Sequence, residues 1–109
     1  MEVRRGDLVT LAIAGDYGKP RPALVIQSDA FNALESVTLL RLTSELHDWP
    51  LFRITIEPTP STGLQKPSQI MVDKAATVPK EKIKQLIGRA DTGTMSAVNV
   101  ALARFLELA

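Results

Sequence analysis

The most informative absence in this sequence is cysteine, which does not occur among its 109 residues. Without thiols the chain cannot form disulfides, thiolate metal sites or a cysteine nucleophile, and this composition suits a reducing cytoplasm. The sequence also has a single histidine, His47, and its carboxylates show no metal-ligand spacing. We therefore expect a protein that works without disulfides, metal ions or other cofactors.

Long apolar runs and strong charge are missing as well. No apolar stretch approaches the roughly 20 residues that span a bilayer, and the charged start, Met1 to Asp7, is unlike a signal peptide. The formal net charge is only +1, so binding of nucleic acid must depend on a local basic patch. With 45% apolar residues, the composition predicts one globular domain, residues 1–109, and no membrane association.

What is present is a series of short strand patterns separated by turns. Apolar or alternating runs bounded by glycine, proline and polar residues predict strands. The predicted strands cover Leu8–Ile13, Ala23–Gln27, Val37–Thr43, Phe52–Glu57, Ser68–Asp73 and Lys82–Arg89. Two loops rich in proline and glycine, Ala14–Pro20 and Pro58–Pro67, interrupt this series. Short helical turns are predicted within Ser28–Glu35 and at Lys80–Lys82.

Alternation along two of these strands predicts which side chains face the core. In the third strand, Arg41 and Thr43 fall on the same face. In the fifth strand, Ile70 and Val72 are predicted to face the core. The opposite face of the fifth strand then carries Gln69, Met71 and Asp73.

The C-terminal segment changes to a helical period. Asp91 or Thr92 can cap a helix. Apolar residues then recur at steps of three and four, at Met95, Val98, Leu102, Phe105 and Leu106. We expect this stripe to pack on the sheet as core. Together, the patterns predict a mainly β fold with a C-terminal helix, built as a small, strongly bent antiparallel sheet or barrel.

Arg21 draws attention because it lies between Pro20 and Pro22 at the start of the second strand. Each proline fixes its own φ and pushes the preceding residue toward extended backbone, so Arg21 is held extended on both sides. Its planar guanidinium suits a phosphate or a carboxylate. The ordinary alternative is a surface arginine that ends a strand.

Short motifs occur in a characteristic order along the chain. They are Arg5-Gly6-Asp7-Leu8-Val9, Arg21-Pro22-Ala23-Leu24-Val25-Ile26, Leu42-Thr43, Gly63-Leu64-Gln65-Lys66-Pro67-Ser68 and Val72-Asp73-Lys74. Their order and spacing resemble the MazF/PemK/Kid family over essentially the whole chain. The resemblance implies an SH3-like barrel, close in fold to CcdB toxins, that acts as a homodimeric toxin of a toxin–antitoxin pair. It also implies metal-independent, sequence-specific cleavage of single-stranded RNA and inhibition by a cognate antitoxin.

The resemblance also assigns roles to individual residues. It implies that Arg21 and Thr43 are catalytic, and that Asp16 and Asp73 act as acid or base or orient the arginine. Candidate RNA contacts are Lys19, Arg41, Arg53, Lys66 and Lys74, among which Arg41 shares a strand face with Thr43. The chain departs from the family pattern at Met71, where some members use an arginine, and in a shorter first loop.

Cleavage of RNA without metal can use the substrate's own 2′-hydroxyl as nucleophile, leaving a 2′,3′-cyclic phosphate and a 5′-hydroxyl. Arg21 suits the stabilisation of the extra negative charge on phosphorus, and Thr43 can donate to a second oxygen. A guanidinium holds its proton strongly at neutral pH, which argues against Arg21 as the main proton donor. Asp16 and Asp73 are the candidate bases, with solvated surface carboxylates as the alternative.

Three aromatic or imidazole side chains leave alternatives open. His47 follows the third strand and could act as a base, although exposed loop histidines are common. Trp49 and Phe52 could stack on an RNA base. Burial in the core or at a dimer contact is the favoured alternative for both.

Two other function classes fit a small barrel of this kind. One is a gyrase poison like the CcdB toxins, which bind a protein and cut nothing. The other is a non-catalytic SH3-like binding module. The gyrase-poison reading gives Arg21 and Thr43 no chemical task, so the favoured reading is a cytoplasmic endoribonuclease toxin.

Overall fold

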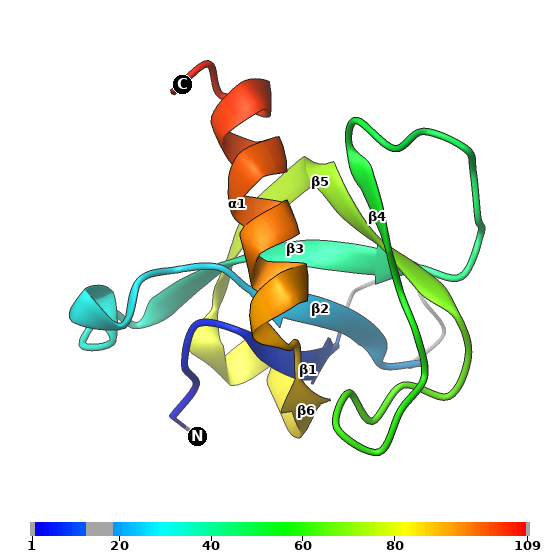
Figure 1. Cartoon of the computed structure of the whole chain (residues 1–109). Helices are drawn as coiled ribbons and strands as arrows, with labels where there is room; N and C mark the ends of the chain where they lie inside the picture. The colour runs from blue at the N-terminus through cyan, green and yellow to red at the C-terminus, as the bar shows by residue number, and fades with distance from the viewer. Residues whose placement is uncertain (1, 13–18, 109) are drawn as a thin grey trace.

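The computed structural model describes residues 2–12 and 19–108. Within these residues, six strands form one antiparallel sheet in the order β4-β5-β3-β2-β1-β6, and one α-helix crosses it (Figure 1). The strands are β1 (Asp7–Leu11), β2 (Arg21–Val25), β3 (Ser36–Thr43), β4 (Arg53–Ile56), β5 (Ser68–Pro79) and β6 (Ile83–Arg89). The helix, α1, spans Thr92–Phe105. This architecture confirms the predicted mainly β fold with a C-terminal helix.

The predicted strands all exist, but β5 is much longer than expected. The prediction ended at Asp73, whereas β5 continues to Pro79 because residues 75–79 pair with the first half of β3. Short 3₁₀ turns at Asp29–Phe31 and Lys80–Lys82 confirm the predicted helical turns. Ile13, the predicted end of the first strand, and most of the loop Ala14–Pro20 lie outside the described residues.

The sheet is bent strongly enough to bury apolar side chains on both faces. One cluster includes Leu40, Ile70 and Val72, and α1 covers it with Val98. A second cluster on the other face gathers Val9, Ala23, Val25, Val37 and Leu39. β5 serves both clusters, since its first half supplies the first and its second half packs against the second. The β3–β5 register shifts between Leu40 and Leu42, where β5 changes course.

The helix α1 begins where the sequence predicts it. Asp91 caps it, because the Thr94 N–H donates to the Asp91 carboxylate at 2.7 Å. Val98 and Ala101 are buried, but Phe105 and Leu106 are 53% and 56% exposed, so the expectation that the whole stripe is core is wrong. The last turn extends beyond the strands, so the sheet does not cover it (Figure 1).

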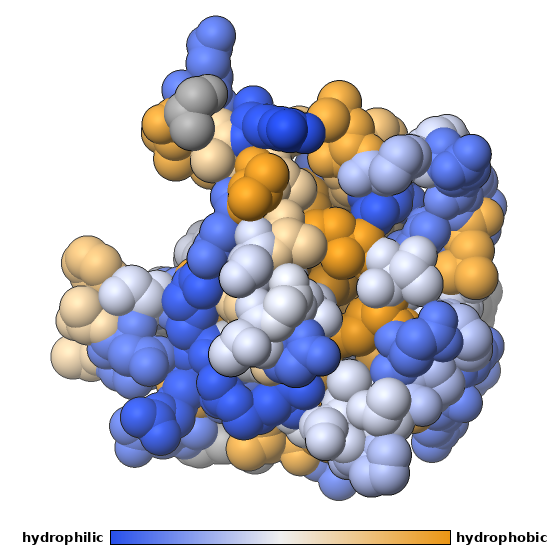
Figure 2. Space-filling model, viewed as in Figure 1, coloured by the Kyte–Doolittle hydropathy of each residue, from blue (hydrophilic) through white to orange (hydrophobic). Residues whose placement is uncertain are grey.

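An apolar strip remains on the surface between α1 and β4 (Figure 2). We call it the α1–β4 strip; it includes Pro50, Leu51, Ile54 and Val100. Leu51 and Val100 are both more than half exposed. In the described part of the chain, no helix is both long and apolar enough to cross a membrane.

Candidate active site

A groove of about 700 Å³ opens where β2 begins and β3 ends. The loop after β4 and part of β6 complete its walls. Cationic side chains from separate segments line it, namely Lys19, Arg21, Arg41 and Lys66. No described residue of this lining is acidic. The groove therefore offers concentrated positive charge on a chain whose formal net charge is only +1.

The pairing of β2 with β3 brings Arg21 to Thr43. Ala23 is the Cα partner of Arg41, and the strands run antiparallel. If this register continued for two more residues, Arg21 would lie opposite Thr43. Both residues line the groove. A face that is apolar in mid-strand thus becomes polar and cationic at the strand ends.

The hydroxyl of Thr43 has a defined orientation. The Glu45 backbone N–H donates to Thr43 Oγ1 at 3.1 Å, in a turn that directly follows β3. Because Thr43 Oγ1 accepts this hydrogen bond, its O–H is still available to donate one to another group. Thr43 is half-buried at the groove wall, where a phosphate oxygen could accept that proton.

Arg41 presents a buried nitrogen for which the described part of the chain supplies no hydrogen-bond partner. Its Nε is enclosed, and no described group accepts from it. A buried donor without an acceptor costs about 1–3 kcal/mol, more when charged, so such a group needs an explanation. Arg41 lies in the same groove as Thr43, and an anion bound there would supply the missing acceptor.

One wall of the groove is a loop whose backbone is tightly fixed. Gly63 in this loop has φ +68°, and a Cβ there would lie 1.9 Å from the carbonyl oxygen of Ile87. Thr62, which is buried, donates its hydroxyl to the carbonyl of Glu57 at 3.0 Å and accepts the N–H of Thr59. This loop carries Lys66 and Gln65 into the groove lining.

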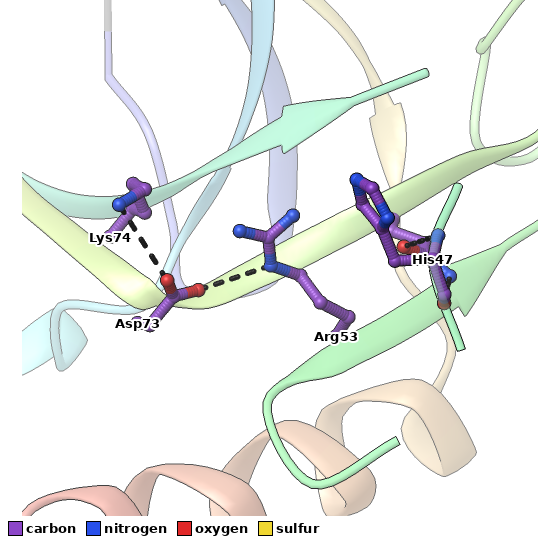
Figure 3. Close-up of polar contacts among 5 residues, drawn as sticks. His47, Arg53, Asp73 and Lys74 are labelled. Atoms are coloured by element: carbon purple, nitrogen blue, oxygen red, sulfur yellow. Dashed lines mark hydrogen bonds and ion pairs between the residues drawn. The ribbon is translucent and has the colours of Figure 1, made fainter. Parts of the chain in front are cut away.

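Asp73 and Lys74 lie outside the groove. Asp73 accepts a hydrogen bond from Arg53 Nε at 3.2 Å, and Lys74 Nζ lies 3.7 Å from the same carboxylate (Figure 3). Met71, two residues earlier on β5, does line the groove. Arg53 is the Cα partner of Met71 and also bonds Asp73, so Asp73 lies further along β5, beyond the groove. Lys74 is 59% exposed at its side chain.

The environment of Asp73 makes it a weak base. Burial by itself raises the pKa of Asp73, but the hydrogen bond from Arg53 and the nearby charges of Arg53 and Lys74 outweigh it. The pKa of Asp73 therefore lies below its usual value of 3.8. A carboxylate of low pKa accepts a proton poorly at neutral pH, and this geometry favours the orienting role over the basic one.

The loop after β3 holds an aromatic stack. The rings of His47 and Trp49 are parallel with centroids 3.9 Å apart, and the Arg53 guanidinium lies 5.2 Å from the Trp49 ring. Trp49 is 43% exposed, so the core of one chain does not bury it and its burial at a dimer contact stays a prediction, whereas Phe52 packs against the first cluster. His47 lies 3.5 Å from the Glu45 carboxylate and does not line the groove.

The structure thus unites five of the candidate site residues, Lys19, Arg21, Arg41, Thr43 and Lys66. Asp16 lies outside the described residues. Sequence reasoning missed several polar groove residues, Thr10, Ser44, Gln65, Ser68 and Gln85. Gln65 and Ser68 were within a quoted motif, but no periodicity marks Thr10 or Gln85, which meet as partners of β1 and β6. Among the described residues, no three His, Asp or Glu side chains gather as metal ligands.

Comparison with known proteins adds independent information. Residues 4–106 match the family described as PemK-like, MazF-like toxin of type II toxin–antitoxin system. The chain is 47% identical, over 98% of its length and 99% of the relative's, to a Mycolicibacterium smegmatis protein named probable endoribonuclease MazF.

Solved structures show the same fold. An endoribonuclease in complex with its cognate antitoxin from a mycobacterial species is 25% identical, with a TM-score of 0.79 over 98% of this chain and 97% of that one. A MazE–MazF structure from Deinococcus radiodurans is 20% identical, with a TM-score of 0.81 over the full length of both chains. The second likeness, at that identity, concerns the fold alone.

Proposed function

The chain belongs to the PemK-like, MazF-like toxin family of type II toxin–antitoxin systems, and from this premise we propose that it is an endoribonuclease toxin that cuts single-stranded RNA in the groove. One observation carries the assignment of the site. Four cationic side chains from three segments meet Thr43 in one groove whose described lining has no carboxylate. Such a lining attracts the phosphates of an RNA backbone, and no described carboxylate in it would repel them.

The proposed chemistry is metal-independent transfer of the phosphodiester to the neighbouring 2′-oxygen. The 2′-oxygen attacks phosphorus and loses its proton, while the bond from phosphorus to the 5′-oxygen breaks and that oxygen gains a proton. The products are a 2′,3′-cyclic phosphate and a 5′-hydroxyl. Arg21 stabilises the charge on the non-bridging oxygens, and Thr43 donates its hydroxyl to one of them. Arg41 neutralises a phosphate through its unpartnered Nε.

Two residues, Asp16 and Asp73, are candidates for proton transfer. For Asp73 we propose an orienting role through Arg53, since its lowered pKa and its place outside the groove disfavour proton abstraction. Asp16 remains the candidate base. Arg41 also offers an answer to the missing arginine of the family pattern, because it enters the same groove that Met71 lines.

The test is cleavage of a mixed single-stranded RNA by purified protein in EDTA, with analysis of the new ends. We expect 2′,3′-cyclic phosphate ends from the wild type. Arg21→Ala should lower the rate by about 10²–10³, the usual effect of removing one preorganised donor. Arg4→Ala serves as the matched control, because Arg4 is exposed and does not line the groove. Intact RNA together with gyrase-dependent DNA breaks would favour the gyrase-poison alternative instead.

The proposal includes two protein partners and a location. A cognate antitoxin would neutralise the toxin by laying an extended acidic segment in the cationic groove. One of the similar solved structures is an endoribonuclease in complex with its cognate antitoxin. A second copy of the chain would cover exposed apolar residues of the α1–β4 strip. We propose that the protein acts in the cytoplasm, where its proposed substrate RNA occurs. Sedimentation of the wild type and of Leu51→Glu tests the homodimer, which the charge should dissociate.

A further inference from the structure

We propose that Gln69 is a positioning residue for RNA cleavage, because its side chain fixes the loop that orients the Thr43 hydroxyl. The inference rests on the proposed function of the groove, which it deepens by adding a residue that does not touch substrate. Gln69 was expected on the polar face of β5, yet it is only 5% exposed. A buried carboxamide on a strand needs partners, and the partners of Gln69 are specific.

Gln69 makes a paired contact with the backbone of the loop after β3. Its Nε2 donates to the His47 carbonyl at 2.8 Å, and its Oε1 accepts the His47 N–H at 3.0 Å. Figure 3 shows the side chain of His47 beside β5, next to this contact. The carboxamide thus satisfies both backbone groups of one loop residue, as a neighbouring strand would do.

The backbone of Gln69 holds the other end of the same loop. Gln69 is the Cα partner of Thr43 on β3, and also of Thr55 on β4. One residue therefore anchors the loop at its start, through the sheet, and at His47, through its side chain. Between these anchors lies Glu45, whose N–H donates to Thr43 Oγ1. Loss of the side-chain anchor would release the Glu45 N–H and with it the orientation of the Thr43 hydroxyl.

The expected consequence is a change in kcat more than in KM. The cationic residues that bind the RNA backbone, such as Arg21 and Lys66, come from segments that Gln69 does not hold. Substrate binding should then persist while the Thr43 donor is misplaced. Misplacement of a reacting or stabilising group by about 1 Å can cost up to about a hundredfold in rate.

The chain offers a matched control in Gln27. Its Nε2 donates to the Phe31 carbonyl at 3.2 Å, and its Oε1 accepts the Thr38 N–H at 3.1 Å. Gln27 therefore clamps another loop, and neither it nor its partners line the groove. Gln27→Met and Gln69→Met each remove a carboxamide that bonds both a backbone N–H and a backbone carbonyl. Only the second should affect the Thr43 hydroxyl.

The experiment measures kcat and KM of RNA cleavage, with melting temperature, for both methionine variants. We expect Gln69→Met to lower kcat by about tenfold to a hundredfold with little change in KM. Gln27→Met should lower the melting temperature and leave kcat unchanged. In a Thr43→Val background, Gln69→Met should cause no further loss of kcat, since its effect passes through that hydroxyl.

Gln69→Glu supplies a second readout that a purely structural role would not give. Ionised Glu can accept the His47 N–H but repels the His47 carbonyl, whereas protonated Glu can make both bonds. The kcat deficit of Gln69→Glu relative to wild type should therefore shrink as the pH falls. A wild type that cleaves RNA alongside a fully active Gln69→Met would overturn this inference alone. Equal kcat losses at Gln27 and Gln69, or additive losses with Thr43→Val, would also overturn it. A wild type without cleavage overturns the proposed function itself.

Discussion

The four cationic residues of the groove predict a definite salt dependence of RNA binding. Each phosphate neutralised on a single strand contributes about −0.7 to the slope of log affinity against log salt concentration. If Lys19, Arg21, Arg41 and Lys66 each neutralise one phosphate, the slope is about −2.8 per groove. Raising salt from about 50 to about 200 mM should then weaken binding by about 50-fold.

Two lysine variants separate the groove from the rest of the surface. Lys66→Met removes one groove cation, so its slope should fall to about −2.1, which is about a 20-fold loss over the same salt range. Lys74→Met removes an equal charge from an exposed site outside the groove and should keep the wild-type slope. Fluorescence anisotropy with a single-stranded RNA that carries 2′-O-methyl groups throughout measures affinity without cleavage.

Two results would refute this reasoning. Equal slopes for Lys66→Met and Lys74→Met would mean that RNA does not follow the groove. A wild-type slope shallower than about −1 would mean that the groove cations do not contact phosphates. Either result would also mean that the cationic lining of the groove does not support the proposed RNA site.

Three further predictions concern the framework of the site. Gly63→Ala should lower both the melting temperature and RNA affinity, because a Cβ at φ +68° meets the Ile87 carbonyl and displaces the loop that carries Lys66. Asp73→Asn should lower the free energy of unfolding at pH 7. Because the pKa of Asp73 is lowered on folding, this contribution is present above about pH 3.8 and is lost as the pH falls through the folded value. Urea titrations at neutral and acidic pH should show the difference from wild type shrinking. Leu40→Ala should cost about 2–5 kcal/mol in the same assay, since Leu40 is fully buried, and a cost below about 1 kcal/mol would contradict the described core.

Local sequence patterns predicted the positions of the strands and the helix better than the lengths of these elements. Alternation and turn residues located all six strands and the helix start at Asp91. They missed the second half of β5, because Ala75 to Pro79 form a strand only by pairing with β3. They also predicted, wrongly, that Phe105 and Leu106 belong to the core. The spacing of apolar residues shows which face of a helix is apolar, but not how far the sheet beneath that helix extends.

Part of the candidate site could also be predicted from the sequence. Arg21 and Thr43 could be named from motifs, and the register of β2 and β3 explains why they meet. Asp73 could not be placed, because its contact with Arg53 depends on the pairing of β4 with β5. Gln69 gave no signal at all, since its importance depends on a backbone contact with a loop 22 residues away.

The sequence by itself determined that this chain is a mainly β protein with a capped C-terminal helix, without thiols, and with an arginine held extended between two prolines. Those properties follow from local backbone preferences and side-chain chemistry. Only the tertiary structure decided which charges share the groove, where β5 changes course, and that a buried glutamine holds the loop beside Thr43. Such features depend on strand register and on contacts between distant segments, which local preference does not encode.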